Sequence, residues 1–184
     1  EFVPVEELGG VGVGGLGREV QARHVHLEDR LLAKRHAVQD QCVSGHIDRT
    51  KTRHETLLGW CTLLAKAPSG HVIVCQPHNH EVALMGELSA QTLAARGVLG
   101  YVVDGGSRDT DLVLEQGFPV FCSFLTPADI VARWIPDRFG EPVTIGTVTI
   151  ASGDYLLGDR DGVVVIPRAL VEEVVAKTEE VVST

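Results

Sequence analysis

Residues 71–109 read HVIVCQPHNHEVALMGELSAQTLAARGVLGYVVDGGSRD. Two short apolar runs, 71–76 and 98–103, are rich in Val and predict buried β-strands. Between them, residues 81–96 place their apolar side chains at helical spacing, and Gly97 follows where a helix would end. The stretch therefore predicts a strand–helix–strand unit, the building block of an α/β protein with parallel strands.

The flanking sequence extends this pattern in both directions. We expect further helices at 56–67, 110–116 and 168–182, and further strands at 118–124, 142–150 and 162–166. Segment 44–55 is polar throughout and predicts a loop or a sheet edge, and residues 18–40 carry only a ragged helical stripe. The fold class is thus α/β: one domain over 1–184 with a mixed, barrel-like sheet flanked by helices, and an atypical N-terminal segment at 1–55.

Composition restricts the function classes. The chain of 184 residues has a formal net charge of −9, which argues against non-specific nucleic-acid binding through a basic surface. No apolar run approaches the roughly 20 residues that span a bilayer, and no secretory signal pattern begins the sequence, so we expect a cytoplasmic protein without a membrane anchor. The widely spaced cysteines, which we expect to be buried and reduced, are Cys42, Cys61, Cys75 and Cys122.

Three polar residues follow the central strands. Glu87 lies on the helix after the first strand, and Arg108 and Asp109 lie in the loop after the second. Since parallel strands end at one sheet edge, the three side chains converge on one crevice. Asp109 suits Mg²⁺ or Mn²⁺, Arg108 suits a carboxylate or a developing enolate, and Glu87 suits proton transfer through water. The alternative is that Arg108 and Asp109 form an ordinary loop salt bridge.

These motifs carry a resemblance to a known family. Glu87, twenty intervening residues and then Arg108-Asp109 match the acid-x20-Arg-Asp signature of RraA-like proteins. The runs GELSAQTLAARGVLGYVVDGGSRD, GFPVF and SGDYLLGDRDGVVVIP also resemble that family, and the likeness covers roughly residues 57–182. The family includes divalent-metal-dependent 4-hydroxy-4-methyl-2-oxoglutarate/4-carboxy-4-hydroxy-2-oxoadipate aldolases. It also includes regulators that inhibit ribonuclease E.

The resemblance implies a swivelling β/β/α fold, assembled as homotrimers or hexamers with active sites at subunit interfaces. It implies that Asp109 and waters hold the metal, that Arg108 stabilises the pyruvate enolate, and that Glu87 orients a water as acid or base. The backbone amides of Gly86, Glu87 and Leu88 would bind the carboxylate of a 2-keto acid. Oxaloacetate decarboxylation is implied as a side activity. A further acid from a neighbouring subunit is expected, with Glu179 or Glu180 available but without a matched motif.

The expected activity is thus a metal-dependent lyase, and the rival is a non-catalytic regulator of ribonuclease E. The intact acid-x20-Arg-Asp set favours the lyase.

Other motifs are weaker. Gly12-x-Gly14-x-x-Gly17 satisfies a dinucleotide-binding pattern but lacks the preceding buried strand. His71, His78 and His80 with Glu81 predict exposed loop residues rather than a zinc site, and residues 159–162 predict a hairpin turn rather than a calcium loop. Ser107 has no His beside it in the sequence that would make it a nucleophile.

Overall fold

A computed structural model describes residues 18–20, 38–159 and 161–183 of the chain. The strands are β1 (Arg18–Val20), β2 (Val38–Ile47), β3 (Val72–Gln76), β4 (Gly100–Ser107), β5 (Val120–Leu125), β6 (Trp134–Phe139), β7 (Val143–Ile145), β8 (Val148–Ile150), β9 (Tyr155–Gly158) and β10 (Val163–Ile166). The helices are α1 (Arg53–Lys66), α2 (Glu87–Ala95), α3 (Thr110–Glu115), the 3₁₀ turn η2 (Arg168–Leu170) and α4 (Val171–Val182).

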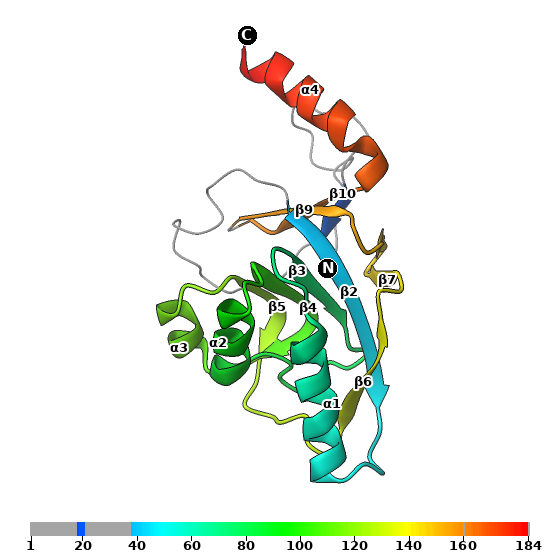
Figure 1. Cartoon of the computed structure of the whole chain (residues 1–184), viewed down its shortest axis with the longest axis vertical. Helices are drawn as coiled ribbons and strands as arrows, with labels where there is room; N and C mark the ends of the chain where they lie inside the picture. Colours follow the sequence, from blue (N-terminus) through cyan, green and yellow to red (C-terminus); the bar gives the residue numbers. More distant parts are fainter. Residues whose placement is uncertain (1–17, 21–37, 160, 184) are drawn as a thin grey trace.

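The centre of the fold is a sheet in which β2, β3, β4 and β5 run parallel in that order (Figure 1). β6 pairs antiparallel with the second half of β2, and β9 pairs antiparallel with its first two residues. β10 and β1 continue the sheet beyond β9, also antiparallel, while β7 and β8 form a separate hairpin. The sheet is therefore mixed, with parallel strands in the middle.

Both faces of the parallel strands are covered. Ile73 and Cys75 of β3 belong to a buried cluster that includes Leu63 of α1 and Leu93 of α2. Val74, which points to the opposite face, packs in a second cluster with residues of β7–β10. Burial on both faces explains why β3 and the first half of β4 are continuous apolar runs. The expected α/β fold, with a mixed sheet flanked by helices, is confirmed.

The largest correction concerns β2. Segment 44–55 was expected to be a loop or an edge, but residues 44–47 belong to a ten-residue strand between β3 and β9. The strand carries Gly45 because a Cβ there would overlap the indole ring of Trp134 on β6. Ser44 is buried as well, so β2 lacks the apolar pattern typical of a central strand. The helical stripe expected at 18–40 is also wrong at its two ends, which form β1 and the start of β2. Residues 1–17 and 21–37 lie outside the described residues.

Other expected boundaries also shift. The region 142–150 is a hairpin, β7 and β8, instead of one strand, and β6 and β9 were not expected. The second helix begins at Glu87 rather than at residue 81, because Ala83 and Leu84 pair with Gly106 of β4. The strand expected at 98–103 is β4, which continues through Asp104, Gly105 and Gly106 to Ser107.

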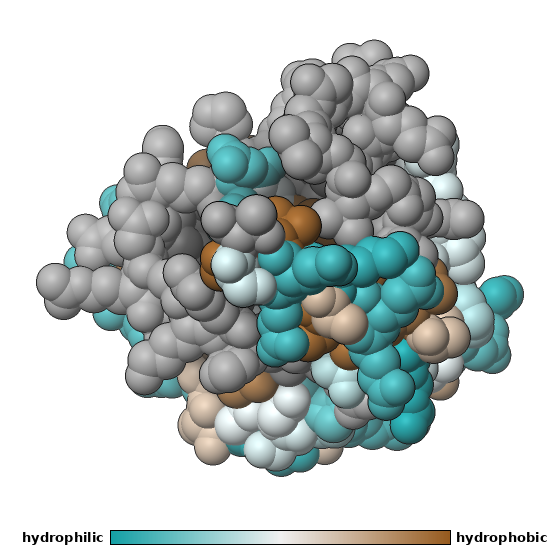
Figure 2. All heavy atoms as spheres, turned by 90° about the horizontal axis from the view of Figure 1, so that it is seen from above, coloured by the Kyte–Doolittle hydropathy of each residue, from teal (hydrophilic) through white to brown (hydrophobic). Residues whose placement is uncertain are grey.

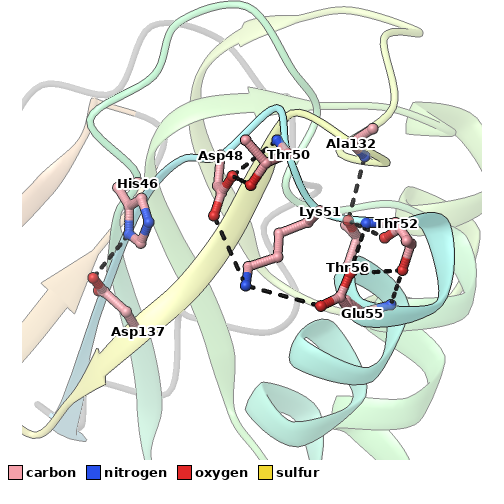
Figure 3. A network of polar contacts seen from close by, with 9 residues as sticks. All are labelled: His46, Asp48, Thr50, Lys51, Thr52, Glu55, Thr56, Ala132 and Asp137. Carbon is pink, nitrogen blue, oxygen red and sulfur yellow. Dashed lines mark hydrogen bonds and ion pairs between the residues drawn. The ribbon is translucent and has the colours of Figure 1, made fainter.

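Helix α1 begins at Arg53, three residues earlier than expected, because a capping box fixes its start (Figure 3). The Thr52 hydroxyl accepts from the Glu55 N–H, and the Glu55 carboxylate accepts from the Thr52 N–H. The next residue, Thr56, is buried, and its hydroxyl accepts from the N–H of Ala132 (Figure 3). The start of α1 is thereby joined to the loop between β5 and β6.

Helix α4 lies at the opposite end of the molecule from α1 (Figure 1). Val175, Val181 and Val182 are exposed along it. Viewed from this end, apolar side chains lie among hydrophilic ones on the surface (Figure 2). Within the part of the chain that the structure describes, none of the helices has the length and apolar character needed to cross a membrane.

Candidate functional site

The residues just before α2 are hydrogen-bonded to strand β4 of the central sheet. Ala83 makes a parallel bridge with Gly106 of β4, and the Leu84 N–H donates to the Gly106 carbonyl at 2.8 Å. The Arg108 N–H then donates to the Met85 carbonyl at 3.0 Å. These bonds place the first turn of α2 against the chain that leaves the carboxyl end of β4.

Asp109 lies at this junction. Its carboxylate oxygen Oδ2 accepts a hydrogen bond of 3.1 Å from the backbone N–H of Glu87, the first residue of α2. A negative charge at a helix N-terminus is stabilised by the helix dipole. Asp109 itself has φ 54° and ψ 38°, a left-handed conformation that is uncommon for a residue with a side chain. The backbone is therefore bent so that the Asp109 carboxylate faces α2.

Gly86 makes this approach possible. A Cβ at Gly86 would lie 2.6 Å from Asp109 Oδ2 and 3.1 to 3.2 Å from the Cγ and Nε atoms of Arg108. Because Gly86 has an extended backbone with φ −167°, the glycine is needed for space and not for its conformation. The Gly86–Glu87 turn and the Arg108–Asp109 pair are packed in direct contact.

Arg108 is held between two carboxylates. Its Nη1 donates to Asp129 Oδ2 at 2.8 Å, and its Nε lies 3.6 Å from Asp109 Oδ2. Partial burial raises the pKa of Asp129, but the hydrogen bonds from Arg108 and the Val131 N–H, together with nearby Arg charges, outweigh it, so this pKa lies below its ordinary value. Asp129 is therefore ionised at neutral pH and orients the guanidinium.

The remaining expected binding residues lie on the first turn of α2. The Glu87 side chain is half-buried, and among the described residues no hydrogen bond or ion pair involves its carboxylate. Its backbone N–H, expected to bind a substrate carboxylate, donates to Asp109 in this structure. The Leu88 side chain is exposed and lines a groove beside Arg108. The structure thus brings Gly86, Glu87, Leu88, Arg108 and Asp109 to one place.

The described residues can hold a divalent cation only through few protein ligands, with waters and substrate as the others. They contain no group of three His, Cys, Asp or Glu side chains placed to hold a metal ion. Asp109 supplies a half-exposed carboxylate, whose Oδ1 takes part in no hydrogen bond to a described residue. A single carboxylate completed by waters and substrate suits Mg²⁺ or Mn²⁺, which prefer oxygen ligands, and does not suit zinc.

The structure separates the other candidate groups. His80 contacts Asp104, and His71 contacts the Ser69 carbonyl just before β3. His78 and His80 are exposed as expected, whereas His71 is half-buried. The turn at 159–162 joins β9 to β10 in a hairpin, as expected.

Three further expectations have different outcomes. Cys42, Cys75 and Cys122 are buried, but Cys61 is exposed, so the expectation of four buried thiols is wrong for Cys61. Glu179 and Glu180 lie on α4, which is at the opposite end of the molecule from α1 (Figure 1). The Gly12–Gly17 pattern lies outside the described residues.

Asp129 is a site residue that the sequence reasoning missed. It lies in the loop after β5, the next parallel strand, so its position follows from the same rule that grouped Glu87 with Arg108. The topological rule could have predicted this position, because the loop after each parallel strand lies at the same edge of the sheet. No motif around residue 129 marked it.

Comparison with known proteins identifies the family. The sequence model of the RraA-like family, described as Aldolase/RraA, matches residues 21–165. A putative 4-hydroxy-4-methyl-2-oxoglutarate aldolase of Halalkalibacterium halodurans is 35% identical over 98 residues, covering 53% of this chain and 46% of that protein. A protein of the same description from Ectopseudomonas mendocina is 38% identical over 88 residues, covering 48% of this chain and 54% of that protein.

The fold has solved relatives as well. A crystal structure of Streptomyces coelicolor RraAS2, described as an unusual member of the RNase ES inhibitor RraA protein family, superposes with a TM-score of 0.66 at 25% identity. The superposition covers 78% of this chain and 71% of that one. The chain spans about half the length of the two curated relatives named above. Because the family model matches most of its residues, the chain belongs to the RraA-like family.

Proposed function

We propose that the protein is a divalent-metal-dependent aldolase that cleaves a 4-hydroxy-2-keto acid to pyruvate and a second carbonyl compound. The observation that carries this proposal is the packing of Arg108 and Asp109 against the N-terminus of α2. It places a guanidinium, a carboxylate and helix N–H groups within one small region at the edge of the sheet. This is the set that binds a 2-keto acid and stabilises an enolate.

Each residue has a role in the proposed mechanism. The Arg108 guanidinium, oriented by Asp129, donates to the 2-keto oxygen and offsets the negative charge that develops there. The N–H groups at the N-terminus of α2 that do not donate to Asp109, those of Gly86 and Leu88, bind the substrate carboxylate. Asp109 would hold Mg²⁺ or Mn²⁺, which would supply further positive charge to stabilise the developing enolate.

Proton transfer is assigned to Glu87. Its carboxylate accepts the proton of the C4 hydroxyl through a water, and the C3–C4 bond then breaks to leave an enolate and a carbonyl product. Return of a proton to C3 gives pyruvate. Loss of CO₂ from oxaloacetate forms the same enolate, so the proposal includes oxaloacetate decarboxylation.

Assembly is also part of the proposal. The family resemblance supports a homotrimer or hexamer with sites at subunit interfaces. In such an assembly Glu179 or Glu180 on α4 of a neighbouring copy would supply the further acid of the site.

The test is pyruvate release from oxaloacetate and from 4-hydroxy-4-methyl-2-oxoglutarate, with Mg²⁺ or Mn²⁺ and again with EDTA. We expect turnover with metal, loss with EDTA, and at least a hundredfold loss in Asp109→Asn. Asp111→Asn is the matched control, because Asp111 is exposed in the first turn of α3 and takes part in none of the contacts above. Metal-independent turnover, or full activity in Asp109→Asn, would contradict the assignment.

A second candidate is a non-catalytic regulator of ribonuclease E. The similarity to RraAS2 over most of the chain favours it. The pyruvate assay separates the aldolase from the regulator, because a regulator releases no pyruvate with either metal. A regulator would instead bind ribonuclease E.

A further inference from the structure

A groove runs from the Arg108–Asp109 pair between helices α1 and α2. It has a volume of about 340 Å³, within the range of small-molecule sites. Its helical walls are formed by Leu57, Trp60, Cys61 and Leu64 of α1 and by Leu88 and Thr92 of α2. The four α1 residues are spaced i, i+3, i+4 and i+7, so they share one face of that helix.

The walls are held at a fixed separation. The Trp60 Nε1 donates to the Ser89 hydroxyl at 2.9 Å, which joins α1 to α2. Trp60 also packs edge-on against Trp134, with ring centroids 6.2 Å apart. The groove is therefore a built feature and not a gap between loosely packed helices.

The groove is apolar along α1 and charged at one end. Leu57 is 41% exposed and Leu88 is 73% exposed. Among the described residues that line the groove, Arg108 is the one cation, and it already pairs with Asp129 at 2.8 Å. One carboxylate of a substrate can be matched at this end, while the residues of α1 and α2 that line the groove beyond it carry no charge to pair with a second carboxylate.

We propose that the substrate is a 4-hydroxy-2-keto monocarboxylate whose C4 carries an apolar alkyl or aryl group lying between α1 and α2. This inference rests on the proposed function and names its substrate class. Cleavage of R–CH(OH)–CH₂–CO–COO⁻ then gives the aldehyde R–CHO and pyruvate, with the hydroxyl proton transferred to C3. The class differs from 4-hydroxy-4-methyl-2-oxoglutarate, which has a second carboxylate where the groove is apolar.

The kinetic test compares two substrates on one preparation. We expect kcat/KM for 4-hydroxy-2-oxooctanoate to exceed that for 4-hydroxy-4-methyl-2-oxoglutarate at least tenfold, as metal-dependent pyruvate release. Leu57→Arg places a cation in the groove, so the ratio of the two values shifts at least tenfold toward the dicarboxylate. Leu58→Arg is the matched control: Leu58 is 58% exposed, neighbours Leu57 and does not line the groove, so the ratio stays unchanged. The inference would be overturned if the wild-type protein had the higher kcat/KM for the dicarboxylate. It would also be overturned if the ratio of the two kcat/KM values were the same in Leu57→Arg as in Leu58→Arg.

A second readout does not need turnover. Cys61 lines the groove and is the exposed cysteine, while the other three are buried, so iodoacetamide labels it in the native protein. With Mg²⁺ present, 2-oxooctanoate slows Cys61 labelling at least fivefold and 2-oxoglutarate at the same concentration does not. Peptide mapping identifies the labelled thiol, and Cys61→Ser is the control.

The two readouts separate the two proposals. If oxaloacetate is not decarboxylated while 2-oxooctanoate still protects Cys61, the aldolase proposal fails and the apolar ligand class stands. If turnover occurs and protection by both ligands is equal, the substrate class is wrong. If Cys61 reacts only after denaturation, a second copy of the chain covers the groove, and this inference is overturned.

Discussion

Replacing Gly86 by Ala tests the site geometry with a single methyl group. The added Cβ would lie 2.6 Å from Asp109 Oδ2, whereas ordinary van der Waals contact begins at 3.4 Å. The carboxylate must therefore retreat by about 0.8 Å, the difference between these distances, and the Arg108 side chain must shift with it. A displacement of about 1 Å at a catalytic group costs on the order of a hundredfold in rate.

The fold should tolerate this change. Gly86 is extended, so Ala adopts the same backbone without strain, and the helix cap loses about 0.5 to 1 kcal/mol. We expect kcat/KM for oxaloacetate decarboxylation to fall 30- to 100-fold while the melting temperature falls by a few degrees at most. The assay is coupled pyruvate detection at saturating Mg²⁺, with thermal unfolding followed by circular dichroism.

Gln91→Ala provides the control, because Gln91 is exposed on the same helix and does not line the groove. It should retain the wild-type rate. If Gly86→Ala kept the wild-type kcat/KM with an unchanged melting temperature, the close packing of Gly86 on Asp109 would have no part in the reaction.

Three further predictions concern stability. Gly45→Ala should lower the free energy of unfolding by about 2 to 3 kcal/mol in urea titrations, because its methyl overlaps the Trp134 ring; no loss would contradict that packing. Thr52→Ala removes the α1 cap and should cost about 1 kcal/mol in the same titration, whereas an unchanged midpoint would argue against the capping box. Asp129→Asn loses the ion pair to Arg108 and should cost under about 1 kcal/mol at pH 7, since both side chains are partly exposed. The pKa of Asp129 is lowered by folding, so this difference is present above the unfolded value of 3.8 and should vanish as pH falls through the folded pKa; a difference that persists in acid would refute the cause.

The sequence predicted the elements whose side chains face apolar surroundings on both sides. The Val-rich runs of β3 and β4 are examples, since each face of these strands packs in its own cluster. The sequence pattern failed for β2, in which Ser44 is buried and Gly45 lies against the Trp134 ring. A strand selected for close approach by a neighbour carries no hydrophobic period, so the pattern of one sequence cannot reveal it.

The same limit applies to the site. The spacing of Glu87, Arg108 and Asp109 was enough to group them, because the rule for parallel strands is topological. The role of Gly86 was expected only through its amide, while the structure shows that its missing side chain admits the Asp109 carboxylate. Contacts across twenty residues of chain depend on the exact register of 83–86 beside β4, which no local pattern specifies.

Asp109 contributes both to the local structure and to the proposed metal binding. The choice of substitution at this position therefore decides which of the two contributions an assay measures. Its left-handed backbone costs on the order of 1–2 kcal/mol for most residues with a side chain, but Asp and Asn adopt it more readily. Ala at this position would remove the charge, the bond to the Glu87 N–H and the conformational preference together. Asn keeps the conformation and a side-chain oxygen that accepts from Glu87, and it removes only the charge. Loss of activity in Asp109→Asn with an intact fold therefore reports the carboxylate charge itself, which is the property that binding a divalent cation requires.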